Sequence, residues 1–402
     1  MNEYFQSKRI LVLGGTGHLG SALIHHLVQT ENVPTAQIRV FYLPDSPTAS
    51  LRDLAGLDMV PGNILQPDRV QAACRDAQLV FHMIGNTSFD PRVKALQWRI
   101  NVEGTRNVLE ACRRSPSVER LCYTGTVNTL GVPNPPGSIG DFSDSDPYTN
   151  LPRLHGFGSP EEVLDFADSI RWGDLALKDA VKRIGIGYFD SKLAAQEIVS
   201  RAVRESGLNV VSVLPGTMFG PHDYLIGNGM YLLALFHNRM PGVLPGGLPL
   251  AHVMDVVEGH LLVMHKAAKG QRYIITGAAE DNRYLKDMAG IIVDVLEEAF
   301  PGRRFNRPSK VFHPGIAKGG ARAMEFISNL TGKPNPLSVA AVRGGSVPSF
   351  YSYAKAQTDL GYFPKRTFQQ AVREMLQYYL AENLMETKAR FLDTNIRAQI
   401  KQ

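Results

Sequence analysis

Short apolar runs alternate with helical patterns along the first half of the chain. Helical spacing of apolar residues occurs at 21–28 and 101–111. Runs typical of buried strands lie at 10–13, 37–42, 58–62, 79–84, 120–124, 208–214 and 271–276. Because strands and helices that alternate in this way build a parallel sheet covered on both faces, the pattern predicts an α/β fold with a doubly wound sheet.

The pattern changes after about residue 281, where apolar residues repeat at helical spacing. Helices are predicted at 285–300, 315–330 and 367–383, and a polar tail covers 386–402. The tail carries scattered apolar residues. It is therefore either a docking helix for a second subunit, as in a homodimer, or a frayed end.

The composition is typical of a globular protein, with 402 residues, 44% of them hydrophobic, and a net charge of +5. Lysine and arginine are scattered, which argues against nucleic-acid binding. We expect no signal peptide and no membrane span, because no apolar run precedes Ile10 and no window of about eighteen apolar residues occurs. The spacing of the three cysteines, Cys74, Cys112 and Cys122, argues against metal ligation and favours buried thiols in the cytoplasm.

A glycine-rich turn follows the first predicted strand. The sequence from Gly14 to Gly20, GGTGHLG, lies between this strand and the helical pattern at 21–28. Glycines let the backbone turn tightly and approach a pyrophosphate, whose charge is stabilised by the helix N-terminus. The turn therefore predicts a dinucleotide site; a tight turn without a ligand is the alternative.

Tyr188 and Lys192 lie four residues apart, and so on one face of a predicted helix. A nearby ammonium lowers the pKa of a phenol, whose ordinary value is about 10, and lets it exchange a proton near neutral pH. Such a pair also arises by chance in exposed helices. The glycine turn upstream favours the catalytic interpretation.

The order of the motifs resembles the extended short-chain dehydrogenase/reductase family of the NAD-dependent epimerase/dehydratase superfamily. The motifs are GGTGHLG, GNI, VFHMIG, INVEGTRNVLEAC, LCYTGTVNTLG, YFDSK and LPGTMFGPHD. The chain is most similar to the branch of dihydroflavonol reductases and 3-beta-hydroxysteroid dehydrogenases. The resemblance implies a Rossmann-type domain over 1–280, to which about 216–245 adds substrate contacts, and a smaller, mainly helical substrate domain over 281–385.

The resemblance also implies catalytic roles for Thr126, Tyr188 and Lys192. Tyr188 would be the general acid in ketone reduction, or the base in alcohol oxidation. Lys192 would lower its pKa and bind the nicotinamide ribose. Thr126, where the family usually has serine, would hydrogen-bond the substrate oxygen; a strand-end cap is its alternative role, and Thr124 is the alternative hydroxyl.

The same resemblance implies a set of cofactor contacts. Asn63, where the family usually has aspartate, would accept from the adenine amine, and Ile64 would pack on the ring. Asn101 matches a family asparagine with either a structural or a catalytic role. The residues expected to contact the cofactor are Gly14, Thr16, Gly17, His18, Leu19, Gly20, Asn63, Ile64, Tyr188, Lys192, Pro215 and Thr217.

The end of the second strand selects between the two nicotinamide cofactors. Tyr42 and Leu43 stand there, so neither the acid typical of NAD sites nor the arginine typical of NADP sites is present. The missing acid and the nearby Arg52 favour NADP(H) over NAD(H). Asp45 is the residue that could reverse this preference.

These residues predict a hydride transfer between nicotinamide and a small-molecule ketone or secondary alcohol. Dehydratases of this superfamily carry an Asp-Glu pair after the catalytic hydroxyl, whereas Val127 and Asn128 follow Thr126 here. A nucleotide-sugar epimerase remains an alternative. A non-catalytic NADP-binding sensor is the alternative of another class.

An insertion at about 132–187 makes the separation of Thr126 from Tyr188 roughly twice the usual one. Ser159 and Pro160 predict a helix start, and a second helix is expected at 174–184. We hypothesise that the insertion forms a lid that brings Phe157, Phe166 or Trp172 to an apolar ligand. A surface decoration or a subunit contact is the alternative.

Four apolar residues of the second half are candidates for lining a hydrophobic substrate pocket, although they also fit an ordinary core: Met218, Met230, Tyr231 and Leu233. His252 and Asp255 are interpreted as a structural pair. His222 and Asp223 are expected to be structural, or to lie at the mouth of the pocket.

Overall fold

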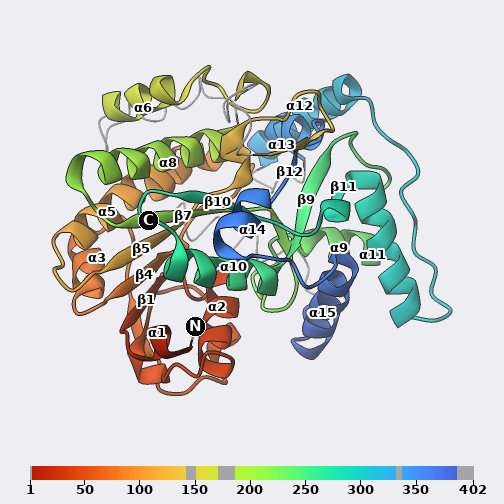
Figure 1. Ribbon diagram of the computed structural model, residues 1–402. Helices are drawn as coiled ribbons and strands as arrows, with labels where there is room; N and C mark the ends of the chain where they lie inside the picture. Colours follow the sequence, from red (N-terminus) through yellow and green to blue (C-terminus); the bar gives the residue numbers. More distant parts are fainter. Residues whose placement is uncertain (1, 142–150, 171–185, 332–336, 387–402) are drawn as a thin grey trace.

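The computed structural model describes residues 2–141, 151–170, 186–331 and 337–386 (Figure 1). Within them, a parallel sheet has the strand order β10-β7-β5-β4-β1-β2-β3. The strands are β1 (Ile10–Leu13), β2 (Ile38–Tyr42), β3 (Asp58–Pro61), β4 (Leu79–His82), β5 (Arg120–Thr124), β7 (Val210–Pro215) and β10 (Arg272–Ile275). The order reverses between β1 and β4, which is the arrangement of a doubly wound Rossmann-type sheet. The predicted fold class is confirmed.

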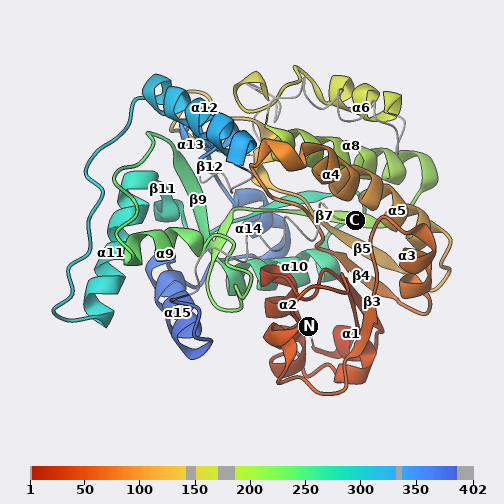
Figure 2. The same ribbon diagram turned by 180° about the vertical axis from the view of Figure 1, so that it is seen from behind.

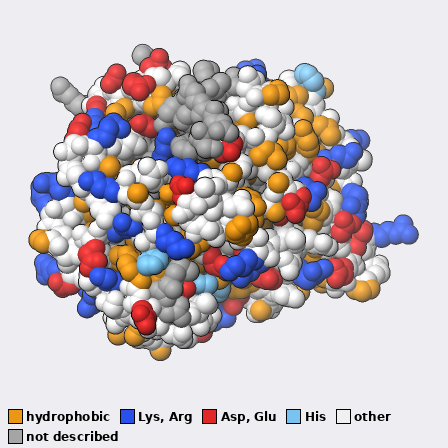
Figure 3. All heavy atoms as spheres, in the orientation of Figure 1, with side chains coloured by type: hydrophobic (Ala, Val, Ile, Leu, Met, Phe, Trp, Pro, Cys, Tyr) orange, Lys and Arg blue, Asp and Glu red, His pale blue; other side chains and the backbone are white. Residues whose placement is uncertain are grey.

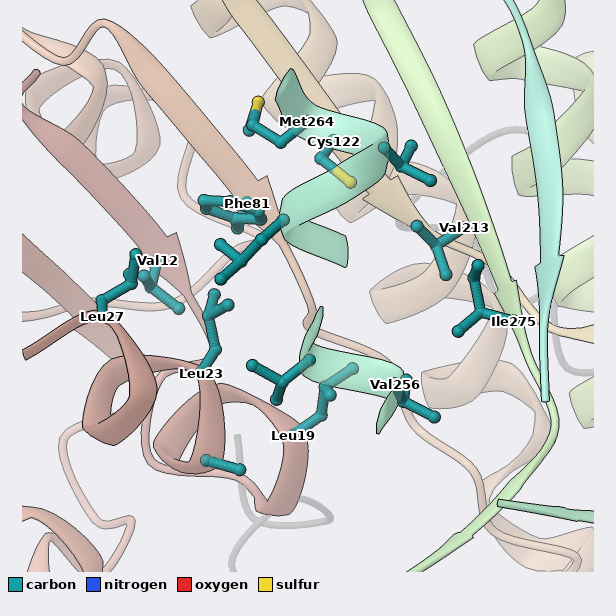
Figure 4. Packing of buried hydrophobic residues seen from close by; sticks show 14 of the residues in the cluster. Val12, Leu19, Leu23, Leu27, Phe81, Cys122, Val213, Val256, Met264 and Ile275 are labelled. Carbon is teal, nitrogen blue, oxygen red and sulfur yellow. The ribbon is translucent and has the colours of Figure 1, made fainter. Parts of the chain in front are cut away.

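Helices cover both faces of this sheet (Figures 1 and 2). Alternate strand residues point to opposite faces, so β1 contributes Val12 to one core and Leu11 to the other. The first core lies under α2 (His18–Gln29) and α10 (Val253–Lys266), and Figure 4 shows Leu23 and Val256 of these helices beside strand residues. The second core lies under α3 (Pro67–Cys74), α5 (Gly104–Arg113) and α8 (Gly187–Ser206).

The helix predicted at 101–111 is part of a longer helical stretch. It runs from α4 (Lys94–Trp98) through a π-helical turn (Arg99–Glu103) into α5. Asn101 lies in the π turn. Such turns redirect side chains and are frequent at functional sites.

Two small sheets accompany the main sheet, and several helices lie in the second half of the chain. The sheets are β11 (Asn282–Tyr284), β9 (Gly247–His252) and β8 (Thr217–Phe219), and β12 (Phe350–Tyr351) with β6 (Ile139–Gly140). The helices are α9 (Met230–Phe236), α11 (Leu285–Ala299), α12 (Pro314–Thr331), α13 (Val339–Gly345), α14 (Ala354–Leu360) and α15 (Phe368–Ala381). The predicted helices at 285–300, 315–330 and 367–383 are confirmed. A short helix, α1 (Asn2–Gln6), precedes the sheet.

The four residues considered as a pocket lining do not form one cluster in the structure. Leu233 is buried in a core formed with α11 and α15, against which Tyr231 packs. Met218 packs against the core under α2, and Met230 is 46% exposed. The apolar pattern in 230–236 therefore reflects the packing of this helix in a core. The sequence alone did not distinguish such packing from a ligand-binding surface.

His252 and Asp255 do not form a pair. His252 Nε2 lies 3.0 Å from a Glu374 carboxylate oxygen, and Asp255 forms an ion pair with Arg366. Both residues join the end of β9 and the start of α10 to the C-terminal segment. They are structural, as predicted, but with different partners.

The insertion packs on the helices at the side of the sheet. Its helix α6 (Pro160–Ser169) begins at Ser159, whose hydroxyl accepts from the Glu162 N–H as the sequence predicted. Phe157 and Phe166 lie 6.5 Å and 5.2 Å, between ring centroids, from the fully buried Trp98. The lid hypothesis is wrong for these two residues, because they complete a core. Trp172 and the helix expected at 174–184 lie outside the described residues.

Apolar side chains gather on the surface over α12, at the upper right of Figure 3. They include Ile316, Phe326, Ile327 and Leu330, all more than half exposed.

In the described ranges, no helix has the length and apolar character needed to cross a membrane. The three cysteines are free and buried, as predicted.

Candidate active site

The glycine turn joins β1 to α2 and leaves an open face at the helix N-terminus. Gly14 has a φ of +92°, and a Cβ atom on Gly20 would lie 2.3 Å from the Gly14 carbonyl oxygen. A Cβ on Gly17, the N-cap of α2, would meet only that oxygen, at 3.4 Å. Gly17 brings no side-chain cap to the first N–H groups of α2. This tight turn with an uncapped N-terminus therefore fits a dinucleotide pyrophosphate.

The side chains of His18 and Leu19 make contacts within the protein. His18 Nε2 lies 3.0 Å from the carbonyl oxygen of Pro221, and Leu19 is buried in the core (Figure 4). Thr16 is buried, and its carbonyl oxygen accepts from the Ser50 hydroxyl at 3.5 Å. These three residues would therefore contact a cofactor mainly through their backbone atoms.

The end of β3 supplies Asn63 and Ile64. The Asn63 amide oxygen accepts the Leu65 N–H at 3.0 Å. The Ile64 side chain is 4% exposed, and it occupies the space left by Gly104, where a Cβ atom would lie 3.0 Å away. Little of Ile64 is left for contact with an adenine ring.

The turn after β7 is fixed by close packing. A Cβ atom on Gly216 would lie 2.5 Å from the Pro249 carbonyl oxygen and 2.6 Å from Thr276 Oγ1. Pro215 ends β7 and Thr217 begins β8, so both stand at the carboxyl end of the main sheet. Ligands of open α/β sheets bind at this edge.

Thr126, Tyr188 and Lys192 come together although they belong to different segments. Thr126 caps the 3₁₀ turn Val127–Leu130 after β5, and Tyr188 and Lys192 lie in the first turns of α8. The Thr126 side chain lies close enough to Tyr188 to lower the pKa of the phenol. Lys192 Nζ donates to the Thr124 carbonyl at 2.8 Å and lies 5.1 Å from the centre of the Tyr123 ring.

Burial decides the protonation of this group. It lowers the pKa of Lys192 from 10.5 to about 8. Burial also raises the pKa of Tyr188 above 10, and the nearby Thr126 side chain only partly opposes this. The net shift of Tyr188 is therefore opposite to the one predicted from the Tyr–Lys spacing, because the sequence does not show how strongly the phenol is desolvated.

Thr124 is engaged elsewhere. Its hydroxyl lies 3.1 Å from Nε2 of His260, whose Nδ1 lies 2.8 Å from the Val256 carbonyl oxygen. Burial lowers the pKa of His260 to about 4, so the ring is neutral and Nδ1 carries the hydrogen. Nε2 then accepts from the Thr124 hydroxyl. Thr126 is consequently the better candidate for contact with a substrate oxygen.

Asn101 holds two segments beside Lys192. Its amide oxygen accepts the Asn86 N–H at 2.8 Å, and its nitrogen donates to the Asn86 carbonyl and the Ser191 hydroxyl at 3.0 and 2.9 Å. A Cβ atom on Gly85 would lie 3.2 Å from Lys192 Nζ. Of the two roles considered for Asn101, these bonds support the structural one, because they engage its whole amide.

His222 and Asp223 also have structural contacts. Asp223 accepts from the Gly227 and Gly229 N–H groups and from the Tyr379 hydroxyl. His222 stacks on His25 with ring centroids 4.3 Å apart. Burial lowers the pKa of His222 to about 4.

Two residues beside the site were not foreseen. His155, from the insertion, lies with Nδ1 2.9 Å from Asp190 Oδ1, and its Nε2 is 2.8 Å from the Asn128 carbonyl oxygen. Both side chains are completely buried. Asp190 lies inside the YFDSK motif. Its charge on an otherwise buried helix face was the feature of the sequence that could have identified it.

An aromatic side chain closes one side of the site. The Phe89 ring packs edge-on against Tyr188 at 5.9 Å and against Phe189 at 5.7 Å, measured between centroids. Phe89 and Tyr188 are only partly buried. A molecule that reaches the Tyr188 hydroxyl from this side would meet an apolar surface.

Two family models match the chain. The 3-beta hydroxysteroid dehydrogenase/isomerase family matches residues 11–153, and the NAD dependent epimerase/dehydratase family matches 180–276. A putative dihydroflavonol 4-reductase from Synechocystis sp. is 26% identical, over 94% of this chain and 96% of that protein. A 3 beta-hydroxysteroid dehydrogenase/Delta 5-->4-isomerase from Mycobacterium tuberculosis is 25% identical, over 93% of this chain and 90% of that protein.

Solved structures support the fold. A dTDP-glucose 4,6-dehydratase from Streptomyces venezuelae, crystallised with NAD, has a TM-score of 0.65 at 17% identity. The likeness covers 93% of this chain and 98% of that one. At this identity it supports the architecture of sheet and helices alone.

Proposed function

Because the chain belongs to the extended short-chain dehydrogenase/reductase superfamily, we propose that it transfers a hydride between a nicotinamide cofactor and a ketone or secondary alcohol. The proposal rests on the approach of the Thr126 side chain to Tyr188, with the Lys192 ammonium buried in the next turn of the helix. Two hydroxyls that converge in this way can hold one substrate oxygen. One of them can also exchange its proton.

The chain's own residues would handle the substrate oxygen. In reduction, the Tyr188 hydroxyl donates its proton to the oxygen as negative charge develops there, and Thr126 holds that oxygen in place. The ammonium of Lys192 stabilises negative charge on the phenol oxygen after the transfer. Since the pKa of Lys192 is about 8, the ammonium form dominates at neutral pH. When bound, the nicotinamide supplies or accepts the hydride.

The glycine turn would hold the pyrophosphate of that cofactor. The matched variants Gly17→Ala and Gly20→Ala test this. The Gly17 methyl enters the open face, so dinucleotide affinity should fall at least tenfold with little change in melting temperature. The Gly20 methyl clashes with the Gly14 carbonyl, so both affinity and stability should fall. Unchanged binding by Gly17→Ala, measured by titration calorimetry, would place the cofactor elsewhere.

NADP(H) is the proposed cofactor in preference to NAD(H). Support comes from Tyr42 and Leu43, which carry no charge that would repel a 2′-phosphate at the end of β2. Arg52 is close in sequence, but its guanidinium forms an ion pair with Glu382 at 2.6 Å. An arriving phosphate would compete with this carboxylate for Arg52.

An apolar ketone is the substrate class that the site favours. The edge of Phe89 lies beside Tyr188, and both pack against the buried Val132, Leu154, Ile186 and Phe189. Two of the relatives are named for the reduction of a dihydroflavonol and the dehydrogenation of a 3 beta-hydroxysteroid. A nucleotide-sugar epimerase is less supported, because the epimerase structures that match this chain are only 15 to 20% identical to it.

We also propose a role for each of the two domains. Residues 1–280 would bind the cofactor, and 281–385 would supply most of the remaining substrate contacts. The buried, free thiols fit a reducing compartment such as the cytoplasm. Whether two chains form a homodimer can be measured by sedimentation.

A substrate panel tests the proposed reaction. Purified protein is mixed with reduced cofactor and with steroid ketones, flavonoid ketones or nucleotide sugars, and the nicotinamide absorbance is followed. We expect oxidation of the cofactor with ketones of the first two groups. Interconversion of nucleotide sugars without net cofactor oxidation would favour the epimerase. Cofactor binding without any turnover would favour the sensor.

A further inference from the structure

We propose that His155 and Asp190 form a buried imidazolium–carboxylate clamp, which positions Thr126 and Tyr188 relative to each other. The clamp rests on the proposed function, because positioning matters only if these two hydroxyls act on a substrate. It assigns a role to the insertion, which supplies His155. His155 is a positioning residue, since it acts through its neighbours.

Each ring nitrogen of His155 faces an oxygen atom. Nδ1 faces Asp190 Oδ1 at 2.9 Å, and Nε2 faces the Asn128 carbonyl oxygen at 2.8 Å. Asp190 Oδ1 also receives the Gly156 N–H at 3.0 Å, so it acts as an acceptor. A neutral imidazole has one N–H and would turn a lone pair toward one of these oxygens, whereas the imidazolium satisfies both.

The clamp connects the two segments that carry the candidate hydroxyls. Asn128, whose carbonyl receives Nε2–H, sends its backbone N–H and its side-chain amide to Thr126 Oγ1 at 3.4 and 3.2 Å. Asp190 lies two residues after Tyr188, in the first turn of α8, with its N–H bonded to the Ile186 carbonyl. One imidazole ring therefore bridges the turn after β5 and the start of the tyrosine helix.

The clamp is also anchored to the C-terminal part of the chain. Arg343 of α13 donates to the carbonyl oxygens of Arg153 and His155 at 3.1 and 3.0 Å. The insertion is thus tied to α13 at His155 and two residues before it. With no exposed surface on either side chain, the pair has no water to replace a lost partner.

The protonation state is tested by ¹⁵N NMR on protein labelled in the histidine rings. The signal of His155 is assigned by its loss in His155→Gln. We expect both ring nitrogens of His155 to carry hydrogen at neutral pH, with the ¹⁵N shifts of an imidazolium. Shifts of a neutral ring would overturn the clamp. This readout needs no substrate, so it stands even if the proposed reaction fails.

The positioning role is tested by kinetics on His155→Gln and Asp190→Asn, with the substrate found for the wild-type protein. Small displacements of reacting groups lower turnover strongly, so we expect kcat to fall about 10- to 100-fold. KM values for cofactor and substrate should change by less than about threefold, because neither residue forms part of their binding surface. A wild-type kcat in both variants would overturn the positioning role.

A double variant separates positioning from folding. His155→Leu/Asp190→Leu removes both charges and should melt at a higher temperature than His155→Leu alone, because no single charge is left buried. Its kcat should remain low. Recovery of kcat together with stability would show a purely structural pair and contradict the proposal. His237→Gln is the matched control, because this histidine also meets a carbonyl, that of Met385, but far from the site in sequence and contacts.

Discussion

Two buried cations flank Tyr188, and they differ in what balances their charge. Lys192 donates to the neutral carbonyl of Thr124, and burial lowers its pKa to about 8. His155 lies between the Asn128 carbonyl and the carboxylate of Asp190. A cation without a compensating charge responds to changes nearby, which suits a group that assists proton transfer. A cation held by a carboxylate is fixed, which suits a group that sets geometry.

The two cations also come from different parts of the chain. Lys192 belongs to the motif through which the chain resembles its superfamily. His155 belongs to the insertion, which adds α6 and a clamp beside the same tyrosine. The insertion therefore contacts the start of α8 through His155, whereas its Phe157 and Phe166 pack against Trp98.

The largest effect is expected from Tyr188→Phe, which removes the group that both cations serve. Loss of a general acid lowers turnover by roughly 10²–10⁴-fold. Cofactor affinity should change little, because the ring remains. Turnover followed by nicotinamide absorbance, with calorimetric binding as control, checks this. Turnover within threefold of the wild type would show that another group donates the proton.

The next largest effect is expected from Asp190→Ala, which leaves His155 without its carboxylate. An uncompensated charge in a buried site costs about 3–5 kcal/mol, so the free energy of unfolding should fall by about that amount. Urea unfolding at neutral pH measures it. A loss below about 1 kcal/mol would indicate that His155 is neutral, and would remove the contrast with Lys192.

Lys192→Met should raise the free energy of unfolding at neutral pH, whereas Asp190→Ala should lower it. The pKa of Lys192 is about 8 in the folded protein and near 10.5 when unfolded, so below pH 8 the buried charge costs about 3 kcal/mol. The variant should therefore be more stable than the wild type at neutral pH. Between pH 8 and 10.5 only the unfolded wild type holds this proton, so wild-type stability rises with pH and the advantage disappears.

Unfolding of both proteins across this pH range tests the difference. A stability gap that does not change with pH would contradict the low pKa of Lys192. The matched variant Lys192→Arg keeps a charge at the site. It should show no gain in stability at neutral pH.

The smallest effect is expected from Arg52→Ala, because this third cation is exposed and already paired with Glu382. The ratio of kcat/KM for NADP(H) over NAD(H) should fall by less than about fivefold. Glu382→Gln, which frees Arg52, should raise the same ratio. If neither variant moves the ratio, Arg52 does not contact the 2′-phosphate.

The sheet was predictable because its signals are local. Ile10–Leu13 and Gly14–Gly20 lie in one short stretch, and the spacing of Tyr188 and Lys192 fits one helix face. Helices α9 and α10 were missed because their apolar residues pack against elements far away in sequence. Their pattern alone does not separate a core from a ligand surface.

The electrostatics of the site were less predictable. The spacing of Tyr188 and Lys192 suggests a lowered pKa for the phenol, but burial reverses the direction. His155 was not identified, because its partners, Asn128 and Asp190, lie on either side of it in the sequence and far from it. Desolvation and long-range hydrogen bonds depend on the folded chain, which a single sequence does not display.

Isotope transfer is a direct test of hydride transfer from the nicotinamide to a ketone. Reduced cofactor carrying deuterium at the nicotinamide C4 is mixed with the wild-type protein and the best ketone of the panel, and the product is analysed by mass spectrometry and NMR. We expect the wild type to form an alcohol with deuterium at the carbinol carbon, and this product to be almost abolished in Tyr188→Phe. Tight cofactor binding with no deuterium in any product would contradict it.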